Sequence, residues 1–379
     1  MAGKLRIAYL IDIIDSDKGG TEKQLLNIIT RLNTNQFEVT LVCLRESPWM
    51  TCNSLPCEVI ALGYCGFLKP CFPIVLMRYL RLLKQRRFTI VQTFFEDSMF
   101  IGYLGKLFSR TRHSLIISRR DLGLGSEEPV YHWFYKKIKP FILRSVDGIA
   151  ANAHAIKDHI VKCENVPLGK MTVISNGLDL PTPPLETPST LLENQADLWI
   201  ANVANLKPIK RVDLLLRAMA KLKEIASDKI IRAVIIGDDK LRVELQNLAD
   251  TLGIDDRVHF MGSIENVSDY LYSMDIGVLC SDKEGLSNAI LEYMACGLPV
   301  VATAVGGNPE LVDRTNGICI PPGDWEALAS AILTLADSRE YREKLGEKSK
   351  RKVLDKYTWD KIMPQWESYY RSLANKNAR

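Results

Sequence analysis

Two glutamates in the second half of the sequence, Glu284 and Glu292, flank the predicted start of a helix. Ser287 can cap that helix, which leaves the backbone N–H groups of its first turn free to bind a diphosphate. Paired carboxylates accept hydrogen bonds from vicinal hydroxyls, as in a sugar or a ribose. The segment therefore predicts a site for an extended polar ligand, built from Glu284, Gly285, Leu286, Ser287, Asn288 and Glu292. The alternative is that both glutamates are solvated surface acids.

Cations follow the first apolar run of the same half. Lys210 and Arg211 come shortly after residues 198–203, with Asn205 between. Charge-assisted hydrogen bonds from such side chains to diphosphate oxygens contribute about 1.5–3 kcal/mol each. The alternative is a solvated basic turn.

Glycine turns occur after several apolar runs. Gly19 and Gly20 follow the first run and precede a helical pattern, so backbone N–H groups there could approach an anion. Thr21 and Gln24 offer a simpler interpretation, because they can form a capping box. No G-x-G-x-x-G or Walker sequence is present, which disfavours a dehydrogenase or a P-loop enzyme.

These residues are carried by a regular alternation of short apolar runs and helix-period segments, typical of parallel sheets with crossover helices. Helical periodicity is clearest over residues 22–31, 74–85 and 130–143. The predicted strands cover residues 7–14, 39–43, 58–61, 89–93, 114–118, 148–152, 171–174, 198–203, 231–236, 258–260, 276–279, 300–302 and 318–320.

The chain of 379 residues exceeds what one hydrophobic core usually serves. Residues 181–188 are rich in proline, which neither helices nor central strands accommodate. We therefore expect two doubly wound α/β domains of Rossmann-like type facing across a cleft. The predicted boundaries are 1–180 for the first domain, 181–197 for a linker, 198–355 for the second domain and 356–379 for a final helix.

Composition excludes several classes of protein. Hydrophobic residues make up 47% and charged residues 25%, ordinary values for a globular protein and unlike those of disordered or fibrous chains. The net charge of +4 does not suggest a nucleic-acid partner. Charge is uneven, since residues 1–190 carry 24 Lys and Arg against 17 Asp and Glu. No apolar run is long enough to span a bilayer.

Nine cysteines match neither a zinc-binding pattern nor a compact disulfide framework. Cys43 and Cys280 end apolar runs and are predicted to be core thiols. We expect a reducing compartment, the cytoplasm, and no disulfide.

The order of these motifs resembles glycosyltransferase family 4, whose members have the GT-B fold and use nucleotide sugars with retention of anomeric configuration. The resemblance covers essentially the whole chain and is most specific over residues 200–330. It is carried by Gly19-Gly20-x-Glu22, the Lys210 loop, Gly237, Glu284-x7-Glu292 and Gly306-Gly307-x-Pro309-Glu310.

The resemblance implies a role for each matching residue. Glu284 corresponds to the glutamate that holds the transferred sugar, and Glu292 to the one that holds the ribose. Lys210 corresponds to the lysine that balances the diphosphate, while Gly19 and Gly20 form the loop that closes over it. Base recognition is expected near Gly262 and Ser263. The segment 359–372 corresponds to a helix that packs back on the first domain.

Four positions depart from the family pattern. Many relatives have arginine at Asn205, glycine at Arg211, and histidines near Phe94 and Arg120. Phe94 cannot make a histidine's hydrogen bond, whereas Arg120 could supply positive charge as a catalytic residue. Arg120 as a plain surface residue is the alternative. Arg211 could replace the arginine missing at Asn205.

The expected activity is metal-independent, retaining transfer of a hexose from a nucleoside-diphosphate sugar to a glycan or lipid-linked acceptor, without a cofactor. A basic segment, residues 78–87, together with Lys136, Lys137, Lys139 and Arg144, could dock on anionic lipid at the inner face of the membrane. A solvated helix face is the alternative. The other functions considered are a non-catalytic nucleotide-sugar sensor, a nucleotide-sugar epimerase and a glycan phosphorylase.

Overall fold

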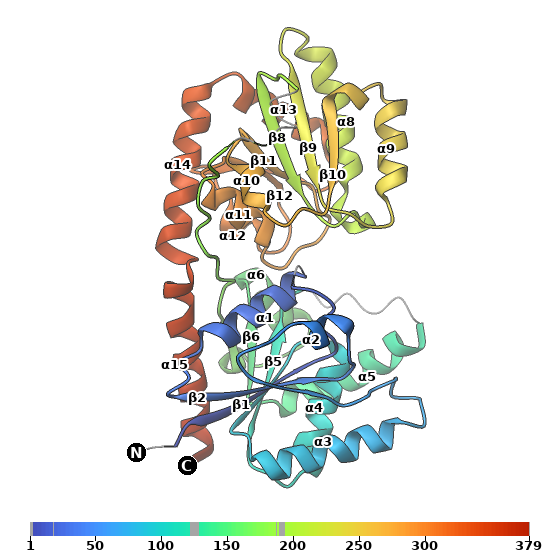
Figure 1. Cartoon of the computed structure of the whole chain (residues 1–379), viewed down its shortest axis with the longest axis vertical. Coiled ribbons are helices and arrows are strands. Elements are labelled where there is room, and N and C mark those ends of the chain that lie inside the picture. Colours follow the sequence, from blue (N-terminus) through green and yellow to red (C-terminus); the bar gives the residue numbers. More distant parts are fainter. Residues whose placement is uncertain (1–2, 18, 122–128, 187, 189–193, 379) are drawn as a thin grey trace. The chain divides into compact units, whose positions relative to one another are not determined.

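The computed structural model describes residues 3–17, 19–121, 129–186, 188 and 194–378. The chain divides into two compact units (Figure 1). Unit 1 comprises Met1–Asn176 and Ile362–Arg379, and unit 2 comprises Gly177–Lys361. Each unit is a parallel sheet with connecting helices, which confirms the expected α/β class and the two Rossmann-like domains.

Unit 1 contains a seven-stranded sheet of order β3-β2-β1-β4-β5-β6-β7, in which all pairs are parallel. The predicted strands of this half are confirmed, with shifts of up to three residues at their ends. The strands are β1 (Leu5–Ile11), β2 (Phe37–Cys43), β3 (Glu58–Ala61), β4 (Ile90–Thr93), β5 (Ser114–Arg119), β6 (Gly148–Ala151) and β7 (Met171–Val173).

Helices pack on both faces of this sheet. Successive residues of a strand point to opposite faces: Leu10 of β1 faces Gly102 of a helix, whereas the hydroxyl of Tyr9 lies 2.9 Å from that of Tyr370 in the last helix. The helices are α1 (Gly20–Arg31), α2 (Pro48–Cys52), α3 (Phe72–Arg86), α4 (Glu96–Phe108), α5 (Pro129–Ser145), α6 (His154–Cys163) and, from Ile362 onward, α15 (Trp359–Ala378).

Unit 2 contains a six-stranded parallel sheet of order β10-β9-β8-β11-β12-β13. Its strands are β8 (Leu198–Val203), β9 (Ile231–Ile236), β10 (Val258–Gly262), β11 (Ile276–Leu279), β12 (Val300–Thr303) and β13 (Gly317–Ile320). Its helices are α8 (Val212–Ile225), α9 (Arg242–Thr251), α10 (Val267–Leu271), α11 (Asn288–Ala295), α12 (Asn308–Leu311), α13 (Trp325–Ala336) and α14 (Arg339–Lys356).

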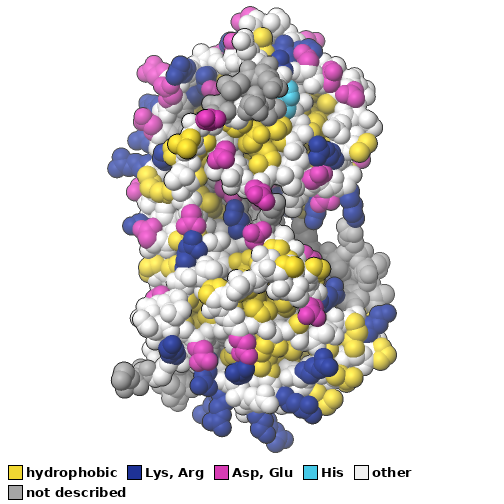
Figure 2. All heavy atoms as spheres, viewed as in Figure 1, with side chains coloured by type: hydrophobic (Ala, Val, Ile, Leu, Met, Phe, Trp, Pro, Cys, Tyr) yellow, Lys and Arg dark blue, Asp and Glu magenta, His cyan; other side chains and the backbone are white. Residues whose placement is uncertain are grey.

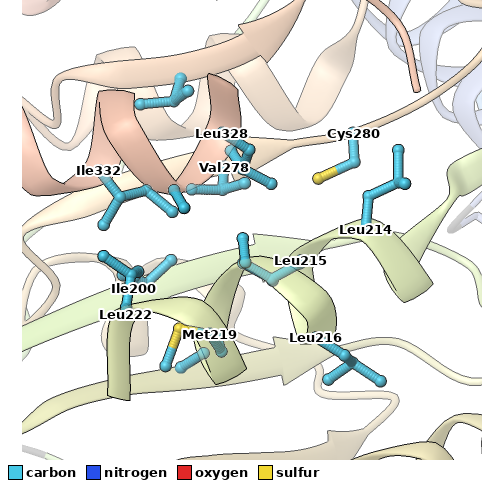
Figure 3. Packing of buried hydrophobic residues seen from close by; sticks show 14 of the residues in the cluster. Ile200, Leu214, Leu215, Leu216, Met219, Leu222, Val278, Cys280, Leu328 and Ile332 are labelled. Carbon is cyan, nitrogen blue, oxygen red and sulfur yellow. The ribbon is translucent and has the colours of Figure 1, made fainter. Parts of the chain in front are cut away.

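The core of unit 2 lies between the sheet and the helices α8 and α13. Leu215 and Met219 of α8 pack with Ile200 of β8 and Ile332 of α13, and all four are buried (Figure 3). Burying such a side chain contributes about 1.5–3 kcal/mol. On the other face, a side chain at Gly277 would overlap the ring of Tyr293 in α11, so this helix packs directly against the strand.

The observed boundaries between the units lie at Gly177 and Ile362, whereas the boundaries predicted from the sequence were positions 181 and 356. Leu178 forms a parallel β-bridge with Thr358, and Gly177 packs against the ring of Trp359. These contacts tie the segment before the linker to the start of α15 within unit 2. Of the expected linker, residues 187 and 189–193 lie outside the described residues.

A disulfide joins Cys65 and Cys71, which corrects the expectation that the chain has none. The loop between them turns back on itself, since Lys69 N–H donates to the carbonyl of Gly66; a six-residue spacing alone does not reveal that turn. Cys43 and Cys280 are buried thiols, as predicted, and burial raises the pKa of each to about 12. Among the described helices, none combines the length and apolar character needed to cross a bilayer.

Candidate functional site

In each unit, the strand order reverses at one place, where crossover connections leave in opposite directions. Ligands of doubly wound sheets bind beyond the carboxyl ends of the strands at such switch points. In unit 2 the switch point lies between β8 and β11, and in unit 1 between β1 and β4. Ligand-binding residues are therefore expected in the segments that follow these four strands.

At the switch point of unit 2, the structure brings Lys210 and Glu284 together. Nζ of Lys210 donates to Oε1 of Glu284 over 2.5 Å, and the two side chains are 25% and 10% exposed. The hydroxyl of Ser281 donates to the same carboxylate oxygen over 2.6 Å. A backbone hydrogen bond from Asp282 to Ile209 holds the two loops together. A cation and an acid from different loops thus share one partly buried position.

The loop after β12 supports the Glu284 loop through its backbone. Gly307 N–H donates to the carbonyl of Gly285 over 2.7 Å, and the hydroxyl of Thr303 donates to the carbonyl of Ser281. Gly306 has a φ of 51°, and a Cβ there would lie 1.9 Å from the carbonyl oxygen of Glu284. Glycine is required at this position by both backbone conformation and close approach.

We expect Gly306→Ala to destabilise the protein by about 3 kcal/mol, because a methyl group would displace the Glu284 loop and a left-handed backbone disfavours alanine. Gly253→Ala is the matched control, since Gly253 also has positive φ but open space around its Cβ position. We expect it to cost about 1 kcal/mol. Urea unfolding of both variants measures the difference, and equal losses would contradict the proposed contact.

The helix start after Glu284 forms as predicted. Ser287 is the N-cap of α11, and its hydroxyl accepts a hydrogen bond from Ile290 N–H over 3.3 Å. Leu286 is buried and Asn288 opens the helix. Glu292 lies on α11 and is half-buried.

The other predicted residues of unit 2 also follow strand ends. Gly237 and Gly262 follow or end the adjacent strands β9 and β10, and the N–H of Gly237 donates to the carbonyl of Gly262 over 2.8 Å. Both have positive φ. Ser263 and Asn205 are exposed beside them. At these strand ends, hydrogen bonds position the backbone groups, whereas the side chains of Ser263 and Asn205 are exposed.

Arg211 lies in the same loop as Lys210, but its guanidinium is engaged by two carboxylates. It pairs with Asp213 at 3.0 Å and with Asp282 at 3.3 Å. The hydrogen bonds that these carboxylates accept, chiefly those that Asp213 accepts, raise the pKa of Arg211. Its φ of 47° is left-handed, a backbone conformation that favours glycine, which is the residue that the family resemblance implies here. The structure gives Arg211 a role in holding the loop.

At the switch point of unit 1, the structure contains a pocket of about 290 Å³, which we call the β1–β4 pocket. Its walls include Asp12, Phe94, Phe95, Glu96, Arg119 and Arg120. Phe94 and Arg120, near which the family resemblance implies histidines, therefore line one pocket. Phe94 is buried and packs against Tyr9, with ring centroids 6.1 Å apart.

Arg120 is oriented by neighbours on other elements. Its Nη2 donates to Oδ1 of Asn176 over 2.6 Å. Burial lowers the pKa of Arg120 to about 10, and the nearby Glu22 of α1 opposes that shift. The pocket wall also includes Thr21 of α1. Arg120 is thus a partly buried pocket residue, which favours a binding role over a plain surface arginine.

The glycine turn after β1 starts helix α1. Gly19 is the N-cap and Gly20 the first helical residue, so Thr21 lies inside the helix and is not its N-cap. The capping box considered for Thr21 and Gln24 is therefore wrong. The helix starts earlier than that box requires, and Gln24 is buried.

Asp12 and Glu96 are pocket residues that the sequence reasoning missed. Burial and the nearby Asp97 carboxylate raise the pKa of Asp12 to about 7, although hydrogen bonds from Ser98 oppose the shift. Burial also raises the pKa of Glu96. Position was the available signal, because Asp12 directly follows β1 and Glu96 starts the helix that comes shortly after β4, and these two strands flank the switch point.

The remaining cations of the pocket wall are paired. Arg119 binds Glu164 through both terminal nitrogens, at 2.9 and 3.1 Å, and Lys139 donates to the same carboxylate over 2.6 Å. Burial works against ionisation of Glu164, but Arg119 and Lys139 outweigh it and lower its pKa.

Two family models match this chain. A family model described as "Glycosyltransferase Family 4" matches residues 18–181, and one described as "Glycosyl transferases group 1" matches residues 198–338. Between them, the two models cover most of the chain.

Curated relatives match over shorter segments. N-acetyl-alpha-D-glucosaminyl L-malate synthase of Bacillus anthracis is 30% identical over 178 residues, which is 47% of this chain and 46% of the relative. The lipopolysaccharide core biosynthesis glycosyltransferase LpsE of Rhizobium meliloti is 32% identical over 143 residues, 38% of this chain and 41% of the relative. The chain thus aligns with less than half the length of these two relatives.

Solved structures match over nearly the whole chain. HepE of Anabaena in complex with UDP-glucose has a TM-score of 0.82 at 20% identity, covering 97% of this chain and 100% of that one. Sucrose-phosphate synthase of Thermosynechococcus elongatus has a TM-score of 0.82 at 21% identity, covering 98% and 99%. At these identities the likeness establishes the GT-B fold.

Proposed function

The chain belongs to glycosyltransferase family 4, and we propose on that basis that it moves a sugar from a nucleoside-diphosphate sugar to a glycan or lipid-linked acceptor. The observation that carries the proposal is the Lys210–Glu284 pair at the switch point of unit 2. Such a donor needs a cation to bind its diphosphate and a carboxylate to bind its sugar hydroxyls. Lys210 and Glu284 supply these two groups in direct contact with each other.

The reaction breaks the bond between the anomeric carbon and the diphosphate oxygen and forms a bond to the acceptor oxygen. Negative charge grows on the diphosphate, so fixed donors aimed at it contribute most to the rate. Lys210 and the N–H groups at the start of α11 supply such donors. We propose that no metal is needed, and that the acceptor attacks from the face the diphosphate leaves, which retains the anomeric configuration.

In the structure, the carboxylate of Glu284 accepts a hydrogen bond from the ammonium group of Lys210. A bound diphosphate would compete for the ammonium group and release Glu284 to accept hydrogen bonds from sugar hydroxyls. Glu292, which lies on α11, is proposed to bind the ribose. Backbone groups at Gly237 and Gly262 are proposed to bind the base. Because Arg211 pairs with Asp213 and Asp282, Lys210 is the cation of this loop that we propose for the diphosphate.

A thermal-shift screen against UDP-, GDP-, ADP- and CDP-sugars tests donor binding. We expect one nucleotide class to raise the melting temperature of the wild type, and to raise that of Glu284→Ala less. Glu244→Ala, an exposed residue of α9, is the matched control and should respond like the wild type. Equal shifts in all three proteins would exclude the role of Glu284. Binding without turnover would favour a nucleotide-sugar sensor.

We also propose that unit 1 contacts an anionic membrane surface, where a lipid-linked acceptor would be found. On α3, Ile74 and Met77 are each 51% exposed, and Arg81 and Lys84 lie further along the exposed face. On α5, Lys137 lies over the ring of the exposed Trp133. Lys and Arg side chains gather with hydrophobic ones on the part of unit 1 where α3 lies (Figure 2).

Reversing the charges of Arg81 and Lys84 to glutamate should weaken binding to phosphatidylglycerol-containing vesicles about 30-fold or more, since each cation contributes about 1 kcal/mol. Co-sedimentation measures the effect. Lys344→Glu with Lys348→Glu, on the exposed face of α14, is the matched control. Vesicle binding that is unchanged by the α3 substitutions, or that is equally strong without phosphatidylglycerol, would contradict the proposal.

A further inference from the structure

We propose that Ser281 is a positioning residue for sugar transfer: its hydroxyl fixes one oxygen of the Glu284 carboxylate, so that the other oxygen is presented to the hydroxyls of the transferred sugar. This inference rests on the proposed function, because it says how Glu284 meets the donor. Ser281 lies three positions before Glu284 in the segment after β11, and it is not among the site residues predicted from the sequence.

The two oxygens of the Glu284 carboxylate have different surroundings. Oε1 accepts from Nζ of Lys210 over 2.5 Å and from the hydroxyl of Ser281 over 2.6 Å. Within the part of the chain that the structure describes, these are the hydrogen bonds that the carboxylate accepts, and Oε2 accepts none. Each oxygen of an ionised carboxylate has about two acceptor sites. Two donors therefore occupy Oε1, whereas Oε2 can still accept hydrogen bonds from a ligand.

Ser281 is fully buried, and its backbone is held by neighbouring segments. Its carbonyl accepts from the hydroxyl of Thr303 over 2.6 Å, and the carbonyl of Thr303 accepts from Nδ2 of Asn308 over 3.0 Å. Thr303 and Asn308 are also fully buried. The N–H of the next residue, Asp282, donates to the carbonyl of Ile209 over 2.9 Å. The Ser281 hydroxyl is therefore a preorganised donor, which loses little conformational entropy when it forms a hydrogen bond.

The two donors on Oε1 respond differently to a diphosphate. The side chain of Lys210 is cationic and 25% exposed, so a diphosphate can compete for its ammonium group. Ser281 is neutral and buried, so its hydroxyl keeps the hydrogen bond to Glu284. When Lys210 binds the diphosphate, Ser281 is the donor that remains on Oε1 and prevents the carboxylate from rotating. Diphosphate binding therefore does not disturb the orientation of Glu284.

A double-mutant cycle without donor tests whether both side chains act on this carboxylate. Ser281→Ala and Lys210→Met each leave one donor on Oε1, whereas the double variant leaves Glu284, whose side chain is 10% exposed, with neither. We expect the double variant to raise the unfolding equilibrium constant about tenfold more than the product of the single effects. Ser349→Ala is the matched control, because Ser349 is a fully buried serine of the same unit whose hydroxyl donates to the carbonyl of Asn316. Combined with Lys210→Met, it should show no such excess in urea unfolding.

Sugar transfer by the full chain tests the positioning itself. With the donor found in the thermal-shift screen, we expect Ser281→Ala to lower kcat/KM about tenfold. Ser349→Ala should leave kcat/KM within about twofold. Inhibition by the free nucleoside diphosphate should stay within about twofold in both variants, because this inhibitor lacks the sugar that Glu284 contacts. A serine that served only the fold would weaken binding of the donor and of the free nucleoside diphosphate alike.

Three results would overturn the inference while the wild type still turns over its donor. They are single-variant losses of stability that simply add, an unchanged kcat/KM in Ser281→Ala, and an equal loss of nucleoside-diphosphate binding in that variant. If the wild type turns over no donor, the proposed function is wrong and the role of Ser281 in sugar transfer is wrong with it. Turnover by the wild type therefore distinguishes failure of this inference from failure of the proposed function.

Discussion

Lys210→Met is expected to lower kcat for sugar transfer by about 10²–10³-fold, the usual effect of removing one preorganised donor from developing negative charge. Nζ of Lys210 is the only ammonium that the structure pairs with Glu284 among the described residues. The loss should appear mainly in kcat, because the charge on the diphosphate is larger in the transition state than in the bound donor. Steady-state kinetics with the donor found in the thermal-shift screen measures it.

Two variants make this result specific. Lys207→Ala removes an exposed lysine of the same loop, which faces Asp239 at 3.8 Å, and should leave kcat within about twofold. The double variant Lys210→Met with Glu284→Gln removes both charges together, so it should recover stability lost in the single variant without recovering activity. Recovered activity in the double variant, or an equal loss in Lys207→Ala, would show that Lys210 acts only through the fold.

Asp12→Asn is expected to stabilise the protein at pH 8 and to give much less stabilisation at pH 4. The folded-state pKa of Asp12 is raised to about 7 from 3.8, so folding favours the protonated acid. The stability that the protonated Asp12 carboxyl contributes is therefore fully present below about pH 4 and is lost as the pH rises through 7. The pKa shift corresponds to a difference of at most about 4 kcal/mol in the free energy of unfolding. Because the pocket admits solvent, we expect Asp12→Asn to raise the free energy of unfolding at pH 8 by about 2 kcal/mol.

Urea unfolding at a series of pH values measures this difference between Asp12→Asn and the wild type. Glu46→Gln, which changes an exposed carboxylate, should follow the wild-type curve throughout. A difference that stays constant between pH 4 and pH 8, or that has the opposite sign, would contradict the burial of an ionisable carboxylate at this position.

Much of the fold could be predicted from the sequence because parallel strands leave a strong local signal. Both faces of these sheets are covered, so β8 and β9 appear as nearly continuous apolar runs, 198–203 and 231–236, that end at polar or glycine turns. The same logic locates Glu284 and Lys210, because both follow strands that meet at the switch point. Ser287 carries its own capping signal, and the structure bears it out.

What the sequence did not reveal depends on contacts between distant segments. Asp12 only acquires its environment when the start of α4 and its residues Asp97 and Ser98 are placed beside β1. Arg211 looked like a free cation until Asp282, far along the chain, was placed against it. The Cys65–Cys71 disulfide depends on how the intervening loop turns. In each case the spacing in the chain carries no information about the partner.

The central claim is that this chain uses an activated sugar through Lys210 and Glu284. The most direct test is release of nucleoside diphosphate from a panel of UDP-, GDP-, ADP- and CDP-sugars, in EDTA, by the wild type and by Lys210→Met. We expect the wild type to turn over at least one donor, and Lys210→Met to fall to a small fraction of that rate. Turnover of none of the donors, or equal turnover by both proteins, would contradict it.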